Sequence, residues 1–376
     1  MAGRGHHRGM LRLPNPFFFE TPSDRWAFTD RDDLVPKLTE LMQARGRRLL
    51  VHGRRRMGKT SLMQNAAKKA GAVFIYCDVS KAAGLNEVAR RLLEAAPPLE
   101  ENLLKRVLRI AEKHFKTVTL SAHRVTLAGE LRADDGPQTL EGVLNFLYEQ
   151  AGVMDRPWTV CLDECQDLRQ LMGERAAWLI RGITQPHRNL NYLLSGSDHR
   201  LVSWLTSPDA AFFKQLSQVD VGTIDAAHLA GWIERRAKVG GLARFPHGAE
   251  IVATAGPCTG DVARLAKVTF DLAAAGHTAG VVAAAYDAIA LVELNTEFEA
   301  HWRNLTLTQR LVLRAVAGGK QPTSSATLRE LGLKSASTAQ KAIEALVERQ
   351  FLVRESGKLI FDNPFFRRWV VFNNRS

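Results

Sequence analysis

The sequence predicts an α/β fold with a parallel sheet core, followed by a helical lid and a C-terminal winged helix-turn-helix. Three observations lead to this prediction. Gly53 to Thr60 read GRRRMGKT, which fits the pattern G-x-x-x-x-G-K-[ST]. Residues 158–164 read WTVCLDE, an apolar run that ends in two carboxylates. After residue 225 the strand patterns stop, and alanine-rich helical patterns follow up to residue 300.

The first motif predicts a phosphate-binding loop because its context is right. Leu49 to Val51 read as the end of a buried strand before the loop, and Ser61 to Ala70 read as the helix after it. Glycines let backbone N–H groups turn inward, and a helix N-terminus adds a positive dipole end. The loop residues Gly53, Arg54, Arg55, Arg56, Met57, Gly58, Lys59, Thr60 and Ser61 are therefore candidate nucleotide contacts. An arginine-rich surface turn is the alternative.

Within this loop, Lys59 is expected to neutralise the β- and γ-phosphates, and the Thr60 hydroxyl is expected to bind Mg²⁺. The second motif supplies the partners. Asp163 is the second candidate for the metal site, and Glu164 would polarise the attacking water as the general base. A buried strand with an acidic turn is the alternative. ATP and Mg²⁺ are the expected cofactors, and ATP hydrolysis is the expected activity.

Three further positions are candidates for contacting the nucleotide. The strand over 191–194 ends in Ser195-Gly-Ser197, so Ser195 or Ser197 could sense the γ-phosphate; ordinary turn chemistry is the alternative. Phe28 or Arg31, upstream of the loop, could cover the adenine or simply cap a helix. Arg264, in the expected lid, could reach the phosphates or make a surface salt bridge.

The expected domains follow from changes in the pattern of predicted strands and helices along the chain. Residues 1–14 form a basic, disordered tail, and 15–224 form the core with an insertion at about 97–138 that contains a small hairpin. Residues 225–300 form the lid, with helices over 226–239, 248–255, 261–275 and 280–299. Residues 301–376 form the winged helix, with helices over 308–317, 325–331 and 337–350 and strands over 351–354 and 358–362.

The winged helix has a predicted inner and outer face. Ala339, Ile343 and Leu346 share one face of its third helix and are expected to pack inward. The candidate DNA contacts lie on the outer face and on the wing: Lys334, Ser335, Ser337, Gln340, Lys341, Arg354 and Lys358. Glu344 and Glu348 on the outer face weaken this interpretation, so the alternative is a winged helix that binds protein.

Composition narrows the function classes. The 376 residues carry a formal charge of +12, which favours polyanionic partners such as double-stranded DNA. No apolar run approaches the length of a membrane span, and the start of the chain lacks the apolar stretch of a secretory signal. Four cysteines make no disulfide framework, so Cys161 and Cys165 are expected to be core residues of a cytoplasmic protein.

Taken together, the motifs resemble those of the prokaryotic "archaeal-type" ATPases, P-loop proteins between the AAA+ and STAND NTPases. The resemblance spans nearly the whole chain, and its motifs are Asn15-Pro-Phe17, Phe28-x-x-Arg31, Gly53–Thr60, Leu162-Asp-Glu-Cys-Gln166, Ser195–Ser197 and Asp362-Asn-Pro-Phe-Phe-Arg-Arg-Trp369. It implies ATP, Mg²⁺, an AAA+-like core and a C-terminal winged helix.

Two positions depart from the family pattern. Lys214 stands near the place of an arginine that would act on a neighbouring subunit's nucleotide, and it lacks the bidentate guanidinium fork. Arg264 follows Gly260-Asp261 by one residue more than in the Gly-Asp-x-Arg pattern of related initiator proteins. The expected function is an ATP-dependent switch acting on DNA; an ATP-gated scaffold with a protein partner is the alternative. A homo-oligomer that clamps DNA is a third hypothesis.

Overall fold

The computed structural model describes residues 14–19, 29, 31–97, 118–121, 124–127, 136–197, 200–333, 335–355 and 357–373. The chain divides into two compact units. The first, Pro22–Thr223, is here called the sheet unit. The second combines Met1–Thr21 with Ile224–Ser376 and is called the helical unit. The helical unit thus contains the expected lid and the expected winged helix together.

The sheet unit is built on five parallel strands in the order β2-β5-β6-β1-β7. The strands are β1 Arg48–His52, β2 Val73–Asp78, β5 Trp158–Asp163, β6 Leu190–Gly196 and β7 Ser217–Asp220. Every residue of β5 and β6 is buried, as expected of central strands covered on both faces. The predicted parallel sheet core is confirmed.

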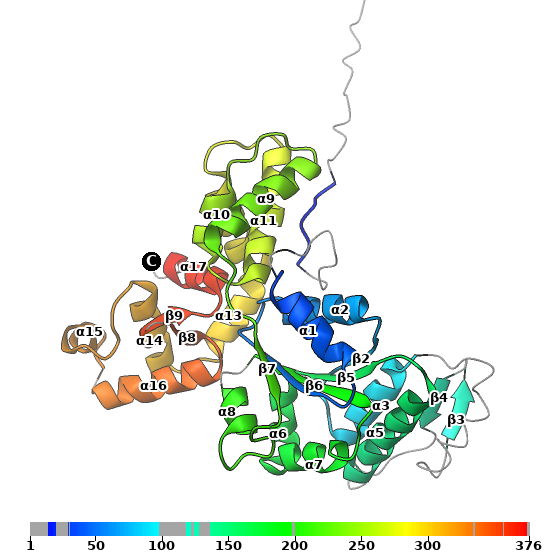
Figure 1. Cartoon of the computed structure of the whole chain (residues 1–376). Helices are drawn as coiled ribbons and strands as arrows, with labels where there is room; N and C mark the ends of the chain where they lie inside the picture. Colours follow the sequence, from blue (N-terminus) through cyan, green and yellow to red (C-terminus); the bar gives the residue numbers. More distant parts are fainter. Residues whose placement is uncertain are drawn as a thin grey trace, which may run out of the picture. The chain divides into compact units, whose positions relative to one another are not determined.

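Helices cover both faces of this sheet. Figure 1 shows α1 and α2 on one face and α3, α5, α7 and α8 on the other. Their bounds are α1 Leu34–Gln43, α2 Lys59–Ala70, α3 Leu85–Ala95, α5 Gly136–Val153, α6 Leu168–Met172, α7 Arg175–Thr184 and α8 Arg200–Thr206. A short 3₁₀ helix, Cys165–Asp167, joins β5 to α6. Leu92, Leu144, Val160 and Leu194 belong to the core between the sheet and the second helical layer.

The insertion contains the hairpin that the alternating pattern predicts. Strands β3 Val118–Ser121 and β4 Arg124–Leu127 pair in antiparallel register. The rest of the expected insertion up to residue 135 lies outside the described residues, as does nearly all of the expected tail.

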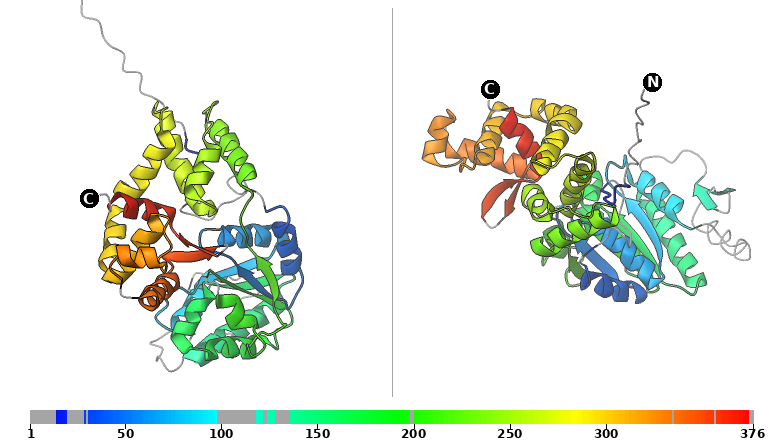
Figure 2. Two further views of the ribbon diagram at one scale, coloured as in Figure 1. Left: turned by 90° about the vertical axis from the view of Figure 1, so that its left-hand side faces the viewer. Right: turned by 90° about the horizontal axis from the view of Figure 1, so that it is seen from above.

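The helical unit begins with a bundle and ends in a winged helix, and both parts appear in the two views of Figure 2. The bundle comprises α9 Ala226–Val239, α10 Gly248–Ala255, α11 Thr259–Ala274 and α12 Val281–Asp287. A π-helical segment, Ala288–Glu293, interrupts the single helix predicted over 280–299, and α13 Asn295–Arg303 follows it. The lid is therefore helical as predicted, with one helix divided.

The winged helix follows the predicted order of three helices and a hairpin. It comprises α14 Leu307–Ala317, α15 Ser325–Glu330, α16 Ala336–Glu348, β8 Leu352–Glu355 and β9 Lys358–Phe361. The predicted inward residues Ala339, Ile343 and Leu346 are 0–2% exposed. A final helix, α17 Pro364–Phe372, was not assigned from the sequence. Phe366 and Trp369 of α17 stack against each other in the core of this unit.

The Asn15-Pro-Phe17 motif packs in the helical unit, whereas the expected core began at residue 15. The Asn15 amide donates hydrogen bonds to the Lys267 carbonyl and to the Asp271 carboxylate, each at 2.8 Å. Phe17 is 1% exposed and packs edge-on against Trp232 and Phe270. A short apolar segment next to a basic tail does not reveal which core it will join, because that depends on a contact more than 200 residues away.

Candidate nucleotide-binding site

The parallel register brings three chain segments to one edge of the sheet. Val51 of β1 lies beside Ser195 of β6, and Leu162 of β5 lies beside Leu194. Because the carboxyl ends of parallel strands face the same way, the loops after β1, β5 and β6 emerge together. This edge therefore holds the phosphate-binding motif, Asp163 at the end of β5, and Glu164 and Ser197 in the loops.

The loop after β1 has the backbone that the phosphate-binding motif requires. Gly53 has φ 152°, Arg56 has φ 62°, and Gly58, at the N-cap of α2, has φ 83°. A Cβ on Gly53 would lie 2.7 Å from the Val221 carbonyl oxygen, so only glycine fits there. The first N–H groups of an α-helix have no partner within the helix itself, so the start of α2, directly after this loop, is suited to an anion.

The Lys59 side chain folds back onto the phosphate-binding loop. Its ammonium donates to the carbonyl oxygens of Gly53, at 2.9 Å, and Arg54, at 3.1 Å. The residue is only 5% exposed, so its charge is held within the curve of the loop. Ser61 is also buried in the first turn of α2.

Asp163 and Thr60, the predicted metal ligands, are brought together by the fold. The Thr60 hydroxyl donates to Asp163 Oδ2 at 3.2 Å. The Tyr76 hydroxyl of β2 donates to the same oxygen at 2.7 Å, and the Glu164 backbone N–H donates to Oδ1 at 3.0 Å. Burial raises the pKa of Tyr76, and the neighbouring Asp163 carboxylate raises it further, so Tyr76 stays a hydrogen-bond donor.

Sequence reasoning missed Tyr76. It lies within β2, outside the motifs from which the site is predicted. The register pairs Tyr76 with Cys161, two positions before Asp163 on the neighbouring strand. The sequence does not show which strand pairs with β2. No local pattern therefore identifies Tyr76 as a site residue.

Glu164, the predicted general base, occupies an unusual backbone position directly after β5. Its φ is 52°, in the left-handed region that non-glycine residues seldom adopt. Its carboxylate oxygen Oε2 accepts hydrogen bonds from the Ser197 hydroxyl at 2.8 Å and from the Gln166 amide. Ser197 in turn receives a hydrogen bond from Arg55 Nε at 3.3 Å.

Of the two serines that could sense the γ-phosphate, only Ser197 contacts Glu164, and the sensor role itself stays a prediction. Ser195 is 0% exposed, and within the described residues its hydroxyl has no hydrogen-bond partner. It lies inside β6 between β5 and β1, whereas the strand ends at Gly196 and leaves Ser197 at the sheet edge.

The structure places two predicted nucleotide contacts in different units. Arg31 is buried and donates to the Met57 carbonyl of the phosphate-binding loop at 3.2 Å, while Phe28 lies outside the described residues. Arg264 pairs with Glu293 and lies 5.0 Å from the Phe19 ring, all in the helical unit. This is the salt bridge named as the alternative for Arg264, so a contact with phosphate stays a prediction.

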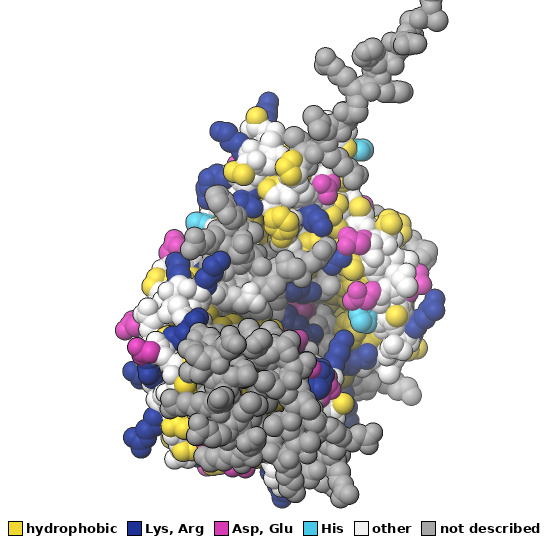
Figure 3. Space-filling view, turned by 90° about the vertical axis from the view of Figure 1, so that its right-hand side faces the viewer, with side chains coloured by type: hydrophobic (Ala, Val, Ile, Leu, Met, Phe, Trp, Pro, Cys, Tyr) yellow, Lys and Arg dark blue, Asp and Glu magenta, His cyan; other side chains and the backbone are white. Residues whose placement is uncertain are grey.

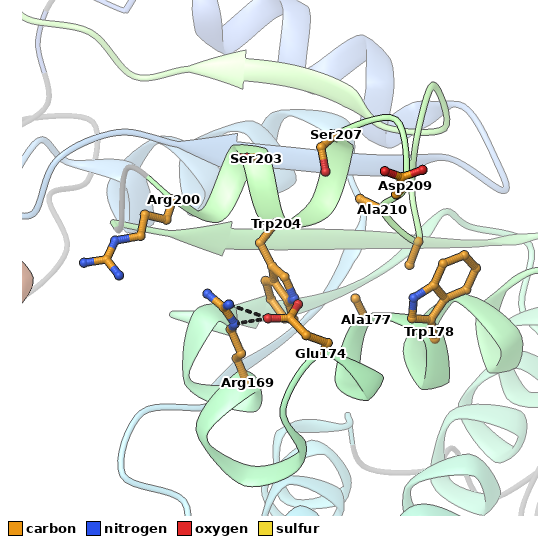
Figure 4. A pocket seen from close by; sticks show the side chains of 11 residues that line it. Arg169, Glu174, Ala177, Trp178, Arg200, Ser203, Trp204, Ser207, Asp209 and Ala210 are labelled. Atoms are coloured by element: carbon orange, nitrogen blue, oxygen red, sulfur yellow. Dashed lines mark hydrogen bonds and ion pairs between the residues drawn. The ribbon is translucent and has the colours of Figure 1, made fainter.

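A pocket of about 460 Å³ opens elsewhere in the sheet unit, among α6, α7, α8 and the loop after α8. Figure 4 shows Trp204 beside the Arg169–Glu174 ion pair, with Trp178 at the other end of the pocket. None of the sequence-predicted site residues lines it. Nearby, Lys214 lies over the Phe213 ring at 5.1 Å, and its proposed action on a neighbour's nucleotide stays a prediction.

The candidate DNA-contacting residues lie on the winged helix with mixed surroundings. Ser337, Lys341, Arg354 and Lys358 are exposed, whereas Gln340 donates to Glu344 at 2.9 Å on the same face of α16. Ser335 caps α16 by accepting from the Thr338 N–H, and Lys334 lies outside the described residues. On the face shown in Figure 3, Lys and Arg side chains are interspersed with acidic ones and form no single block.

The comparisons with known proteins agree with this architecture. Residues 296–371 match a family described as "Probable winged helix domain". Among solved structures, the chain is similar to the Walker-type ATPase PABY2304 of Pyrococcus abyssi, with a TM-score of 0.66 and 18% identity over 95% of this chain and 99% of that one. The chain therefore shares the fold of this ATPase, and its last part is a winged helix.

Two further solved structures with a similar fold come from Aeropyrum pernix. The ORC1 protein in complex with DNA gives a TM-score of 0.52 and 16% identity, over 92% of this chain and 93% of that one. The ORC2 protein, in ADPNP–ADP complexes, gives 0.51 and 15%, over 98% and 100%. No curated protein matches this sequence. The predicted resemblance is thus confirmed at the level of fold.

Cys161 and Cys165 are core residues, as predicted. All four cysteines are free and buried, and burial raises the pKa of the Cys161 and Cys165 thiols well above the ordinary value. Among the described residues, no helix is both long and apolar enough to cross a membrane.

Proposed function

We propose that this protein binds and hydrolyses ATP and uses the nucleotide state as a switch that controls DNA binding. One observation carries the proposal. Lys59, Thr60, Asp163 and Glu164 converge at one sheet edge, with the metal-site pair joined by a 3.2 Å hydrogen bond. This set provides a phosphate cradle, a charge for the phosphates, a metal site and a base, all of which phosphoryl transfer to water uses.

The residues present fit a magnesium–nucleotide complex. Mg²⁺ is commonly held by one or two protein oxygens together with phosphate oxygens, and Thr60 and Asp163 offer one hydroxyl and one buried carboxylate at the mouth of the loop. When bound, the metal would neutralise charge on the β- and γ-phosphates.

The protein side chains then have distinct tasks. The N–H groups of the loop and of the start of α2 bind phosphate oxygens, and Lys59 supplies a buried positive charge. Glu164 accepts a proton from the attacking water, while Asp163 and Thr60 hold the metal. Asp163 belongs to β5, an entirely buried strand, which keeps its position well defined.

The chain also offers a physical route for the switch. It passes between the two units between Thr21 and Pro22 and again between Thr223 and Ile224. Near both passages, residues of the sheet unit contact the phosphate-binding loop region: Arg31 binds the Met57 carbonyl, and the Val221 N–H donates to the His52 carbonyl at 2.7 Å. A change in the loop on nucleotide binding or release is therefore transmitted to both connections.

DNA is proposed as the partner because two features favour a polyanion. The net charge is +12, and the chain ends in a winged helix. The ORC1 protein with the same fold was solved in complex with DNA. On this proposal, α16 reads the major groove, and Arg354 and Lys358 of the wing contact phosphates.

Steady-state ATP hydrolysis, with and without duplex DNA and at two salt concentrations, tests this function. The wild type should turn over ATP, and DNA should stimulate it less as salt rises. Lys59→Ala should lose most ATP binding. Glu164→Gln should still bind ATP, while its kcat falls about 100-fold, as expected when a general base is removed.

A second candidate is a nucleotide-gated scaffold whose winged helix binds a protein. The acidic residues on α16 favour it, since Glu344 binds Gln340 and Glu348 is exposed on the outer face. Turnover at background level, with ATP bound and no response to DNA, would establish this candidate in place of the first.

A further inference from the structure

The motif that ends β5 contains a residue to which no chemistry has been assigned. Gln166 follows the acidic pair by two positions, and it was noted only as part of the family resemblance. In the structure its amide Nε2 donates to Glu164 Oε2. Resting on the proposed ATPase function, we propose that Gln166 is a positioning residue that orients the carboxylate of Glu164.

The first argument is the geometry at Glu164. Glu164 adopts a left-handed backbone conformation between β5 and the 3₁₀ helix. Gln166 and Ser197 both donate to the same oxygen, Oε2. Two donors from different segments fix the carboxylate plane. Within the part of the chain that the structure describes, the other oxygen accepts no hydrogen bond and is left for a water proton.

The second argument is how tightly Gln166 itself is held. Gly196 ends β6, and a Cβ built on it would lie 2.1 Å from Gln166 Oε1. The glutamine amide therefore lies directly against a backbone position that has no side chain. That oxygen is buried and has no hydrogen-bond partner among the described residues. Burying an amide oxygen that accepts no hydrogen bond costs free energy. The hydrogen bond from Gln166 Nε2 to Glu164 offsets that cost.

The third argument is the link to the phosphate-binding loop. Arg55 donates to Ser197 at 3.3 Å, and Ser197 donates to Glu164 at 2.8 Å. Arg55 is exposed on the loop where the phosphates would bind. A phosphate that attracts the Arg55 guanidinium would take away the hydrogen bond that Ser197 accepts, whereas the Gln166 donation to Glu164 involves no residue of the loop.

The experiment compares Gln166→Leu with Gln185→Leu in the full-length chain. Gln185 is an exposed glutamine at the end of α7 and serves as the matched control. Steady-state ATP hydrolysis gives kcat and KM, and titration with a fluorescent ATP analogue gives nucleotide affinity. Thermal unfolding verifies that each variant is folded.

We expect Gln166→Leu to lower kcat about tenfold, with KM and nucleotide affinity within about twofold of the wild type, because only the aligned base is lost. Gln185→Leu should match the wild type. In a Glu164→Ala background, Gln166→Leu should have no further effect on kcat, since a residue that acts through Glu164 has nothing left to orient.

Three results would overturn the positioning role. One is an unchanged kcat in folded Gln166→Leu, and another is an equal loss in the Glu164→Ala background. The third is a change confined to KM and nucleotide affinity, which would make Gln166 a binding residue. If the wild type itself shows no turnover, the proposed function fails, and the positioning role fails with it. Normal wild-type turnover with an unaffected variant overturns the positioning role alone.

Discussion

At the scale of single residues, the candidate site depends on hydrogen bonds between strands that are distant in sequence. Asp163 receives three: from Thr60 after β1, from Tyr76 in β2 and from the Glu164 backbone. A carboxylate with this many donors holds its orientation before any metal binds, which lowers the cost of forming the site. Tyr76 is the member of this set that no motif predicts, and it makes the shorter of the two side-chain contacts to Asp163 Oδ2.

Tyr76→Phe is the matching test, because it removes one hydroxyl and leaves the ring in place. The Mg²⁺ concentration that half-saturates ATP hydrolysis should rise about tenfold, as is typical when an outer partner of a metal ligand is lost. Titrating Mg²⁺ at saturating ATP measures this. Tyr148→Phe, which lies outside the site, is the control. An unchanged half-saturating concentration in the Tyr76 variant would show that Thr60 and the backbone suffice to hold Asp163.

At the scale of elements, a buried histidine joins α5 to β6 in the sheet unit. His187 is 3% exposed, stacks on Tyr148 at 4.2 Å, and contacts the Tyr192 hydroxyl at 2.6 Å and Asn145 Oδ1 at 2.9 Å. Because Asn145 Oδ1 can only accept, Nε2 of the ring donates to it, and Nδ1 of the neutral ring accepts from Tyr192. Burial, and then the charge of Arg48, lower the pKa of His187 to about 4.

This lowered pKa predicts a pH dependence of stability. In the unfolded chain the imidazole takes up its proton near its ordinary value of 6.5, whereas in the fold it resists protonation down to about 4. The stabilising effect of the neutral ring is therefore complete above pH 6.5 and is lost as pH falls toward 4, by about 3 kcal/mol at 1.36 kcal/mol per pKa unit.

His187→Gln removes this titration. The free energy of unfolding, measured with denaturant between pH 7 and pH 4, should fall less in this variant than in the wild type. His277→Gln, at an exposed position, should follow the wild type. Parallel pH profiles for the wild type and His187→Gln would show that the ring is not held neutral by the fold.

For helix α16, the sequence predicted the buried face correctly but did not predict the hydrogen bonds on the exposed face. The 3.6-residue period placed Ala339, Ile343 and Leu346 inward, and they are buried. The same period placed Gln340 and Ser335 outward as free contacts, yet Gln340 binds Glu344 and Ser335 caps the helix. Periodicity reports which face is apolar; it does not report how polar neighbours pair along the other face.

At the scale of the whole molecule, the switch proposal rests on the two passages of the chain between the units. The Asn15–Phe17 segment anchors one passage in the helical unit, and Arg31 anchors it at the phosphate-binding loop. The second passage follows β7, whose continuation at Val221 packs against Gly53. Nucleotide binding in one unit and DNA binding in the other are thus expected to be coupled.

DNA binding by the full chain tests the proposed role of the winged helix. Lys358→Ala, in the wing, should weaken duplex binding at every sequence and reduce the slope of log affinity against log salt by about 1, as expected for the loss of one phosphate contact. Fluorescence anisotropy at several salt concentrations measures both quantities. Lys238→Ala, an exposed lysine on α9, is the control. Equal slopes for both variants would place the DNA contact elsewhere or exclude it.

The sequence by itself determined those features of the protein that depend on residues close together in the chain. A phosphate-binding loop needs glycines and a lysine at fixed spacing between a strand and a helix, so residues 53–60 could be identified without coordinates. Buried strands, amphipathic helices and the winged helix hairpin follow from the period of their apolar residues. For this reason the order of the elements and the roles proposed for Lys59, Thr60, Asp163 and Glu164 were available from the chain.

Only the tertiary structure decided what depends on which strands become neighbours. Tyr76 reaches Asp163 because β2 pairs with β5, and Ser197 rather than Ser195 reaches Glu164 because β6 ends at Gly196. Gln166 is held against Gly196, and Asn15 joins a helix that begins more than 200 residues later. Strand order and long-range packing depend on how the whole chain buries its apolar surface. No short stretch of sequence determines that burial.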